Sequence, residues 1–133
     1  MKKHFVFDFD DTLSSSYDFN QGMFVRTFLP YQPDIDQQYL RTLHKSTRGK
    51  AMHLIFEEAI KHFDLKLDPH KLVKENDEMH LANFDKMTLF SNIHEMFEKL
   101  ISKGKTISIY TNRQYLSLNA MLDHHNLRQY LKH

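Results

Sequence analysis

The sequence predicts an α/β protein built on two parallel strands with a long helical insertion between them. A short apolar run, residues 4–7, ends in a group of aspartates, and a β-branched run occupies residues 106–111. The intervening sequence has apolar residues at helical spacing, and the chain contains only three glycines and three prolines. This composition favours long helices joined by short polar turns.

The first predicted element is a strand over His4–Phe7. The run is short, apolar and bulky, and it stops at Asp8. Such a run is typical of a strand buried in a parallel sheet. Asp8 then lies at the carboxyl end of the strand, which is where α/β sheets place their ligand sites.

Four helices are predicted in the insertion. In the first, apolar residues recur at helical spacing from Tyr17, and Pro30 closes the helix. Asp34 is the predicted N-cap of the second helix, and residues 51–63 form the third. The fourth begins at Pro69, because proline is favoured in the first helical turn.

After the helical insertion, the sequence again shows the alternating helix and strand patterns of an α/β core. Ser91 is a suitable N-cap for a helix that ends at Gly104, since glycine is the residue favoured just after a helix. The β-branched strand over residues 106–111 follows, and a last helix is predicted over 113–125. Strand, helices, strand and helix in this order give the expected α/β core.

Three carboxylates, those of Asp8, Asp10 and Asp11, follow the first predicted strand within four residues. Carboxylates this close repel one another unless a cation or a proton relieves the charge. Mg²⁺ is a hard cation that prefers such oxygen ligands. An alternative is that Asp10 or Asp11 caps the next helix. A calcium loop is excluded, because Leu13 and Phe19 occupy its glycine and final glutamate positions.

Two motifs resemble those of the haloacid dehalogenase-like (HAD) hydrolase superfamily. Residues 5–13 are similar to its first motif, an apolar strand followed by Asp-x-Asp-x-Thr, and residues 107–112 are similar to its second, an apolar strand ending in Thr or Ser. The resemblance implies a HAD-like Rossmann-type parallel sheet core, here only its N-terminal part, with an inserted α-helical cap. The implied domains are the core, residues 1–15 and 89–133, and the cap, residues 16–88.

The resemblance also implies a phosphatase that works through an aspartyl phosphate. Asp8 would be the nucleophile that attacks phosphorus, and Asp10 would be the general acid and base. Thr111 and Asn112 would bind the phosphoryl oxygens. Mg²⁺ would bind a carboxylate oxygen of Asp8 and the backbone carbonyl of Asp10. In this superfamily an aspartate at the position of Asp10 is typical of phosphatases and phosphomutases.

The sequence departs from the family after the second motif. The family has a lysine and a further acidic motif on later strands, and Lys132 is not assigned the lysine role, because it lies close to Thr111 without a flanking strand. Two parallel strands also make a poor sheet. We expect these residues to be the N-terminal part of a longer phosphatase, completed by a C-terminal segment or a partner chain. Alone, this chain should bind Mg²⁺ weakly and hydrolyse its substrate slowly.

Features outside the two motifs carry weaker predictions. Arg48 and Lys50 flank a glycine at the start of the third predicted helix, where they could hold an anionic substrate; solvated surface charge is the alternative.

The ten histidines show no zinc-hydrolase spacing. The net charge of +1 offers no support for a nucleic-acid or anionic-membrane partner. The chain has no cysteine, no signal-peptide core and no long apolar run, so we expect a soluble cytoplasmic protein.

The expected function is Mg²⁺-dependent hydrolysis of a phosphate monoester, with a small phosphometabolite as substrate. A phosphoprotein, for example one carrying phosphotyrosine, is less favoured because it must reach past the cap. A phosphomutase would use the same first-motif residues. From another class, a truncated non-catalytic binding or assembly module would account for the absent motifs, whereas the combination of Asp8, Asp10 and Thr111 favours an enzyme.

Overall fold

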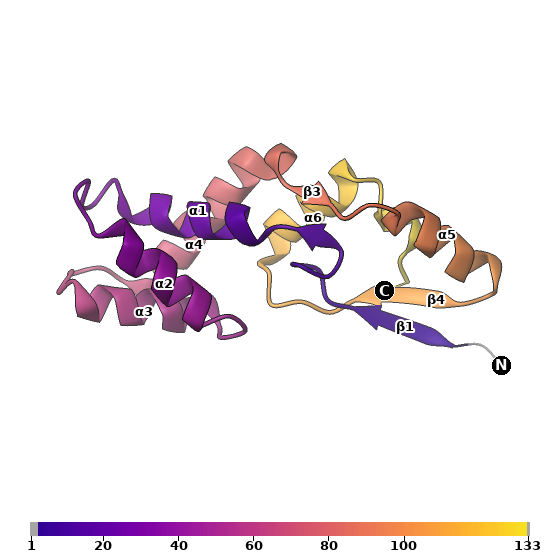
Figure 1. The fold of residues 1–133 in the computed structure, drawn as a ribbon, viewed down its shortest axis with the longest axis horizontal. Helices are drawn as coiled ribbons and strands as arrows, with labels where there is room; N and C mark the ends of the chain where they lie inside the picture. Colours follow the sequence, from indigo (N-terminus) through magenta and orange to yellow (C-terminus); the bar gives the residue numbers. More distant parts are fainter. Residues whose placement is uncertain (1–2, 133) are drawn as a thin grey trace. The chain divides into compact units, whose positions relative to one another are not determined.

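The computed structural model describes residues 3–132, which form two compact units. One unit joins the N-terminal residues up to Tyr17 to the segment from Asn83 onward, and the other comprises Asp18–Ala82. We call them the α/β unit and the helical unit; each can be followed by colour in Figure 1. No helix within residues 3–132 is long and apolar enough to cross a membrane.

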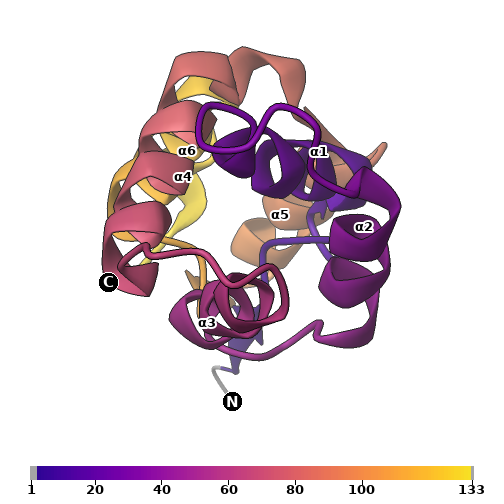
Figure 2. The same cartoon turned by 90° about the vertical axis from the view of Figure 1, so that its left-hand side faces the viewer.

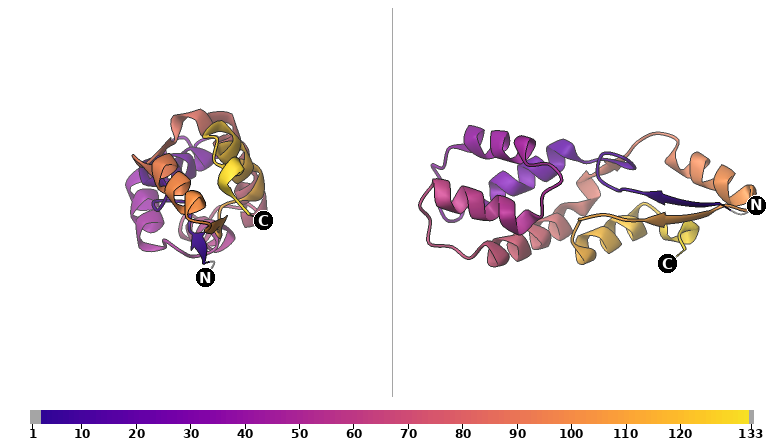
Figure 3. Two further views of the ribbon diagram at one scale, coloured as in Figure 1. Left: turned by 90° about the vertical axis from the view of Figure 1, so that its right-hand side faces the viewer. Right: turned by 90° about the horizontal axis from the view of Figure 1, so that it is seen from below.

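The two predicted parallel strands are present in the α/β unit. Strand β1, His4–Phe7, pairs in parallel with β4, Thr106–Ile109, so that Phe7 lies opposite Ile109. The right-hand view of Figure 3 shows the two strands side by side. The second strand is shorter than expected: it ends at Ile109, and the last backbone hydrogen bond to β1 is donated by the N–H of Tyr110. The α/β fold class is thereby confirmed.

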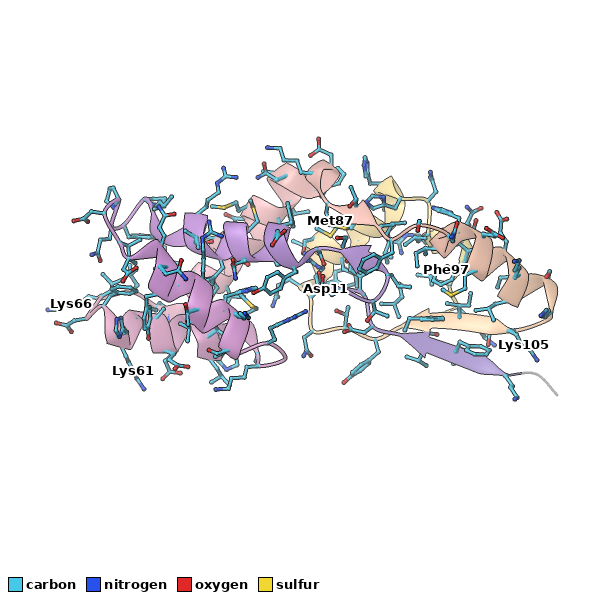
Figure 4. The ribbon with its side chains drawn as sticks, viewed as in Figure 1. Asp11, Lys61, Lys66, Met87, Phe97 and Lys105 are labelled. Atoms are coloured by element: carbon cyan, nitrogen blue, oxygen red, sulfur yellow. The ribbon has the colours of Figure 1, made fainter. Side chains whose placement is uncertain are left out.

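Helices α5, Ile93–Ser102, and α6, Tyr115–His124, complete the α/β unit with two short 3-10 helices, η1, Phe84–Lys86, and η2, Arg128–Tyr130. Figure 4 labels Phe97 on α5, whose ring lies 5.5 Å from that of Phe7. The core of this unit consists of fully buried apolar side chains. They include Phe9, Met87, Phe97, Ile107, Met121 and Leu127.

The ends of α5 illustrate one correct and one wrong prediction. Gly104 follows the helix with a φ of +72°, and its N–H donates to the carbonyl of Ile101 at 2.9 Å, as expected of a glycine in this position. Ser91 is not the N-cap. Asn92 takes that place, with a φ of +67°, because the backbone turns into the helix one residue later than the sequence suggested.

One face of the β1–β4 pair is exposed, which corrects the expectation of a buried first strand. Phe5 and Phe7 are partly buried on the covered face, but Val6 on the opposite face is 60% exposed and Tyr110 is 79% exposed. Within the part of the α/β unit that is described, α5 lies over one face of the pair, and Figure 1 shows no element over the other. The strand is apolar on both faces, but only one face has a neighbour.

The last described residues of the chain lie beside β4, where a third strand of the sheet would run. Leu131 forms a parallel bridge with Ile107, and the N–H of Lys132 donates to the Ile107 carbonyl at 2.7 Å. The Ser108 hydroxyl donates to the Lys132 carbonyl at 2.8 Å. Lys132 therefore lies beside β4, although it belongs to no strand among the described residues, because Leu131 forms only an isolated bridge. Residues 131–132 lie along the edge of β4 that faces away from β1.

The helical unit contains the four predicted helices: α1, Tyr17–Phe28; α2, Gln37–Ser46; α3, Met52–His62; and α4, Pro69–Asn83. Figure 2 shows them. Their core is centred on three buried phenylalanines, Phe24, Phe28 and Phe56, whose ring centroids are 5.0–5.5 Å apart. Asp36, not Asp34, is the N-cap of α2, since its carboxylate accepts the N–H of Tyr39 at 3.1 Å.

A short antiparallel pair that the sequence did not predict lies where the chain enters and leaves the helical unit. Strand β2, Ser14–Ser15, pairs with β3, Thr88–Leu89. The two compact units divide after Tyr17 and before Asn83, and the expected domain divisions at 15/16 and 88/89 stay a prediction. The assignment of the helical unit as a cap over a substrate stays a prediction.

Candidate functional site

The candidate site begins in the loop that follows β1. The N–H groups of Thr12, Leu13 and Ser14 all point to the carbonyl of Phe9, at 3.3, 2.9 and 3.1 Å, so the chain turns sharply here. The side chains of Phe9 and Leu13 are buried and anchor this turn in the core. Asp8, at the start of the turn, is exposed, and its Oδ1 accepts the N–H of Phe9 at 2.8 Å.

The carboxylate of Asp10 is held by two side chains. The Ser16 hydroxyl donates to Asp10 Oδ1 at 2.7 Å. The guanidinium of Arg113 donates through Nε to Oδ2 at 3.0 Å and through Nη2 to Oδ1 at 2.5 Å. The Arg113 side chain is 5% exposed and that of Asp10 is 25% exposed. This ion pair is therefore substantially shielded from water.

Asp11 has a different role from its two neighbours. Its φ is +57°, a conformation that aspartate tolerates better than most residues. Its Oδ1 accepts the N–H groups of Ser16 at 3.2 Å and Tyr17 at 2.9 Å, where α1 begins. Figure 4 labels this side chain in the loop after β1. Asp11 is therefore the aspartate that caps the next helix, whereas the Asp10 carboxylate binds Arg113.

The second motif leaves the sheet beside the first. The N–H of Tyr110 donates to the Phe7 carbonyl at 2.9 Å, which holds the two chain segments together as they leave β1 and β4. Thr111 and Asn112 follow directly. The Thr111 Oγ1 accepts the N–H of Arg113 at 3.1 Å, so this hydroxyl retains its own O–H for donation. Asn112 is exposed.

Four of the predicted site residues therefore belong to loops at the same end of the β1–β4 pair: Asp8, Asp10, Thr111 and Asn112. Arg48 and Lys50 belong to the helical unit, in the turn between α2 and α3, where Gly49 has a φ of +90°. Their predicted contact with a substrate stays a prediction.

Arg113 is the residue that the sequence analysis missed. It connects the two motifs, because its side chain binds Asp10 and its backbone N–H binds Thr111. Its guanidinium carbon also lies 5.9 Å from the centroid of the Phe9 ring. A signal was present, since a nearby cation is one way to relieve the repulsion among crowded carboxylates, but the prediction assigned that charge to Mg²⁺ alone.

The side chains present fit a magnesium ion only in part. Among residues 3–132, no group of three or more His, Asp or Glu side chains could hold a metal ion. The Asp10 carboxylate is already bound by Arg113 and Ser16. The exposed Asp8 carboxylate remains a suitable ligand, because Mg²⁺ commonly takes one or two protein carboxylates and completes its coordination with water and substrate phosphate.

Parallel strands whose carboxyl ends carry acidic and hydroxyl side chains are the arrangement in which α/β proteins place their ligand sites. The family follows from the sequence as a whole. Residues 5–133 match the model of the haloacid dehalogenase-like hydrolases, and the chain belongs to this family. Sequence comparison with curated proteins finds no match.

Several solved structures share the fold of this chain. CbbY from Rhodobacter sphaeroides in complex with phosphate has a TM-score of 0.79 at 17% identity, over 98% of this chain and 61% of that one. Its complex with xylulose-(1,5)bisphosphate gives 0.78 at 18%, over 98% and 61%. A predicted phosphatase from Clostridium acetobutylicum gives 0.74 at 14%, over 99% and 59%. At these identities the likeness shows the fold, and the chain spans about three fifths of each structure.

Proposed function

We propose that this chain carries the nucleophile and part of the phosphate site of a Mg²⁺-dependent phosphatase that acts through an aspartyl phosphate. The observation that carries the proposal is the placement of Asp8, Asp10 and Thr111 at one end of the β1–β4 pair. An exposed carboxylate next to a second carboxylate and a hydroxyl donor is the set of groups that this chemistry needs.

Each residue has a role that suits its surroundings. Asp8 is exposed and attacks phosphorus, which forms the acyl phosphate and releases the leaving group. Asp10 is the acid/base residue, and as a base it takes a proton from the water that hydrolyses the acyl phosphate. Thr111 donates its O–H to a phosphoryl oxygen, since its lone pair already accepts the Arg113 N–H. Asn112 is exposed beside it and adds an amide donor.

Magnesium is the cofactor of this proposal. Its ligands from this chain are a carboxylate oxygen of Asp8 and the main-chain carbonyl of Asp10, with water and substrate phosphate completing the coordination. When bound, the ion offsets the negative charge shared by the carboxylates and the phosphoryl group. The Asp10 side chain is excluded as a ligand in this arrangement because Arg113 and Ser16 already bind it.

The substrate of this proposal is a small phosphorylated metabolite. The structure of CbbY with xylulose-(1,5)bisphosphate gives a sugar phosphate as the ligand of a protein with the same fold. The helical unit is the proposed cap, with Arg48 and Lys50 as candidate contacts to the substrate anion. Their positive charges on either side of Gly49 support that assignment.

The proposed phosphatase also needs a segment that completes its sheet. Within the described residues, the edge of β1 away from β4 pairs with no strand, and Val6 and Tyr110 are exposed on one face. Parallel sheets are normally covered on both faces, and solved structures of this fold extend beyond the part that this chain covers. We place the completing segment on this edge and face, either in the same polypeptide or in a partner.

The test uses the natural polypeptide that carries this sequence. Asp8→Asn should abolish release of phosphate from 4-nitrophenyl phosphate, and Mg²⁺ should raise the melting temperature of the wild type but not of this variant. Asp85→Asn is the matched control, because Asp85 is another exposed aspartate of the α/β unit, in η1. Activity that survives Asp8→Asn would refute the proposal.

A non-catalytic assembly module is the second candidate, and the exposed face at Val6 and Tyr110 is the observation that favours it. Such a module would bind its partner through that face. Substituting Tyr110 with Lys would then abolish the complex, while Asp8→Asn would leave it intact and no phosphatase activity would appear in either form.

A further inference from the structure

The three aspartates that follow β1 have different surroundings, and all of them belong to the α/β unit. The Asp8 side chain is exposed, and its Oδ1 accepts a backbone N–H at 2.8 Å. The Asp10 carboxylate is bound by the guanidinium of Arg113. Asp11 accepts two backbone N–H groups where α1 begins. Of these three residues, only Asp8 is exposed.

The contact between Arg113 and Asp10 occupies both oxygens of the carboxylate. Nε donates to Oδ2 at 3.0 Å and Nη2 donates to Oδ1, which is the two-pronged geometry that makes such pairs strong. The Ser16 hydroxyl also donates to Oδ1, at 2.7 Å. The Arg113 side chain is only 5% exposed. A metal ion that took the Asp10 carboxylate as a ligand would therefore have to leave a buried guanidinium without this carboxylate, which is costly.

The spacing of Asp8 and Asp10 would otherwise allow both side chains to bind one cation. Calcium-binding loops take side-chain ligands from their first and third positions, which is the same spacing. The two common hard cations differ in how much such a second carboxylate matters. Ca²⁺ takes about six to eight oxygen ligands, whereas Mg²⁺ keeps several waters and needs only one or two carboxylates.

We propose that Arg113 is a positioning residue that withholds the Asp10 carboxylate from the bound cation and thereby makes the site favour Mg²⁺ over Ca²⁺. One carboxylate and one backbone carbonyl from this chain suit an ion that keeps its water, and they suit Ca²⁺ poorly. The inference rests on the proposed function, because it uses the ligands proposed there, and it adds the residue that selects the metal.

Calorimetric titration with MgCl₂ and with CaCl₂ tests this inference on the natural polypeptide that carries the sequence. No substrate is present, so proton transfer by Asp10 does not enter the measurement. The measured quantity is the ratio of the two dissociation constants, Kd for Ca²⁺ over Kd for Mg²⁺. In Arg113→Gln, which releases the Asp10 carboxylate, this ratio should fall about tenfold, because the affinity of calcium sites varies by decades with the number of charged ligands.

Three further variants separate ligand release from a general change of charge or structure. Adding Asp10→Asn to Arg113→Gln should return the ratio to its wild-type value, because the released ligand is then absent. Asp10→Asn alone should also keep the wild-type ratio, since in the wild type this side chain does not bind the metal. Arg128→Gln is the matched control, because Arg128 forms an exposed ion pair with Asp123 in the same unit, and both constants should stay unchanged.

Three results would overturn the inference. An unchanged ratio in Arg113→Gln, with the helix content of the wild type, would mean that the released carboxylate does not reach the cation. An equal gain of affinity for both ions would mean that Arg113 acts through its charge alone. A ratio that changes severalfold in Asp10→Asn would mean that this side chain already binds the metal in the wild type, and this result decides the matter should Arg113→Gln fail to fold.

Failure of the proposed function gives a different result. Phosphate release that survives Asp8→Asn refutes the phosphatase proposal, whereas the ratio of dissociation constants is measured without turnover and is judged separately. If neither the wild type nor Arg113→Gln binds either ion, the inference is wrong and so is the proposed cofactor. Phosphate release that depends on Asp8 would then still support the proposed nucleophile.

Discussion

The ion pair between Arg113 and Asp10 should stabilise the α/β unit, and a double-mutant cycle measures by how much. Two unit charges about 4 Å apart attract by about 4 kcal/mol at an effective dielectric constant of about 20, and by about 1 kcal/mol in water. Asp10 is 25% exposed and Arg113 only 5%, so the pair lies between these limits. We expect a coupling free energy of about 2 kcal/mol.

The cycle compares the wild type with Asp10→Asn, Arg113→Gln and the double variant. The free energy of unfolding is measured by urea titration, followed by far-ultraviolet circular dichroism. Because the chain has no tryptophan, helix content is a better probe than fluorescence. Each single variant should be destabilised, and the double variant should lose less than the sum of the two single losses.

A second cycle provides the control. Arg128 Nε lies 2.6 Å from Asp123 Oδ1, nearly the same separation, but these side chains are 50% and 64% exposed. Water and salt screen such a pair, so its coupling should be clearly weaker. The reasoning is wrong if the Arg113–Asp10 coupling does not exceed that of the exposed pair, or if it falls as steeply with added salt.

Four other substitutions, one of them tested against pH, give further expected outcomes, each measured as a change in the free energy of unfolding. Gly104→Ala should cost about 1 kcal/mol because the φ of this residue is +72°, whereas Gly22→Ala, inside α1 with nothing within 4 Å of the added Cβ, should stabilise by about 0.5–1 kcal/mol. Thr27→Val should cost about 1–3 kcal/mol, since the hydroxyl accepts the buried Asn76 amide at 3.1 Å and donates to a carbonyl at 2.8 Å. Burial and two neighbouring histidines lower the pKa of His125 below its unfolded value of about 6.5, so its contribution is present above that pH and is lost as the pH falls. His125→Asn should therefore reduce the loss of stability between about pH 7.5 and 5.5, and an unchanged pH dependence would contradict this assignment.

Elements that rest on local pattern were predictable from the sequence. The strand His4–Phe7 has the predicted bounds, and all four helices of the insertion occur near their expected positions. The exact residues at which helices begin were less predictable. Asp34 and Asp36 are both acceptable N-caps by residue type, and only the backbone conformation, with the Asp36 carboxylate facing the Tyr39 N–H, distinguishes them.

Features that depend on distant partners were not predictable in this way. The two-residue strands β2 and β3 have no periodicity to detect, and they pair because the chain passes the same place twice. The exposure of Val6 follows from what covers the sheet, which is a property of tertiary structure. Likewise, Lys132 lies beside β4 because of the path that the chain takes after α6.

The case of Arg113 shows how little was needed to predict the missing part of the site. Charge repulsion among the aspartates already favoured a nearby cation, and the parallel register alone brings the candidate close. Phe7 pairs with Ile109, Asp10 follows the first of these by three positions, and Arg113 follows the second by four. Two loops that leave neighbouring parallel strands at the same end carry side chains at similar distances from the sheet, so an aspartate and an arginine at those positions can meet. Register, rather than residue pattern, is therefore what links two residues 103 positions apart in the sequence.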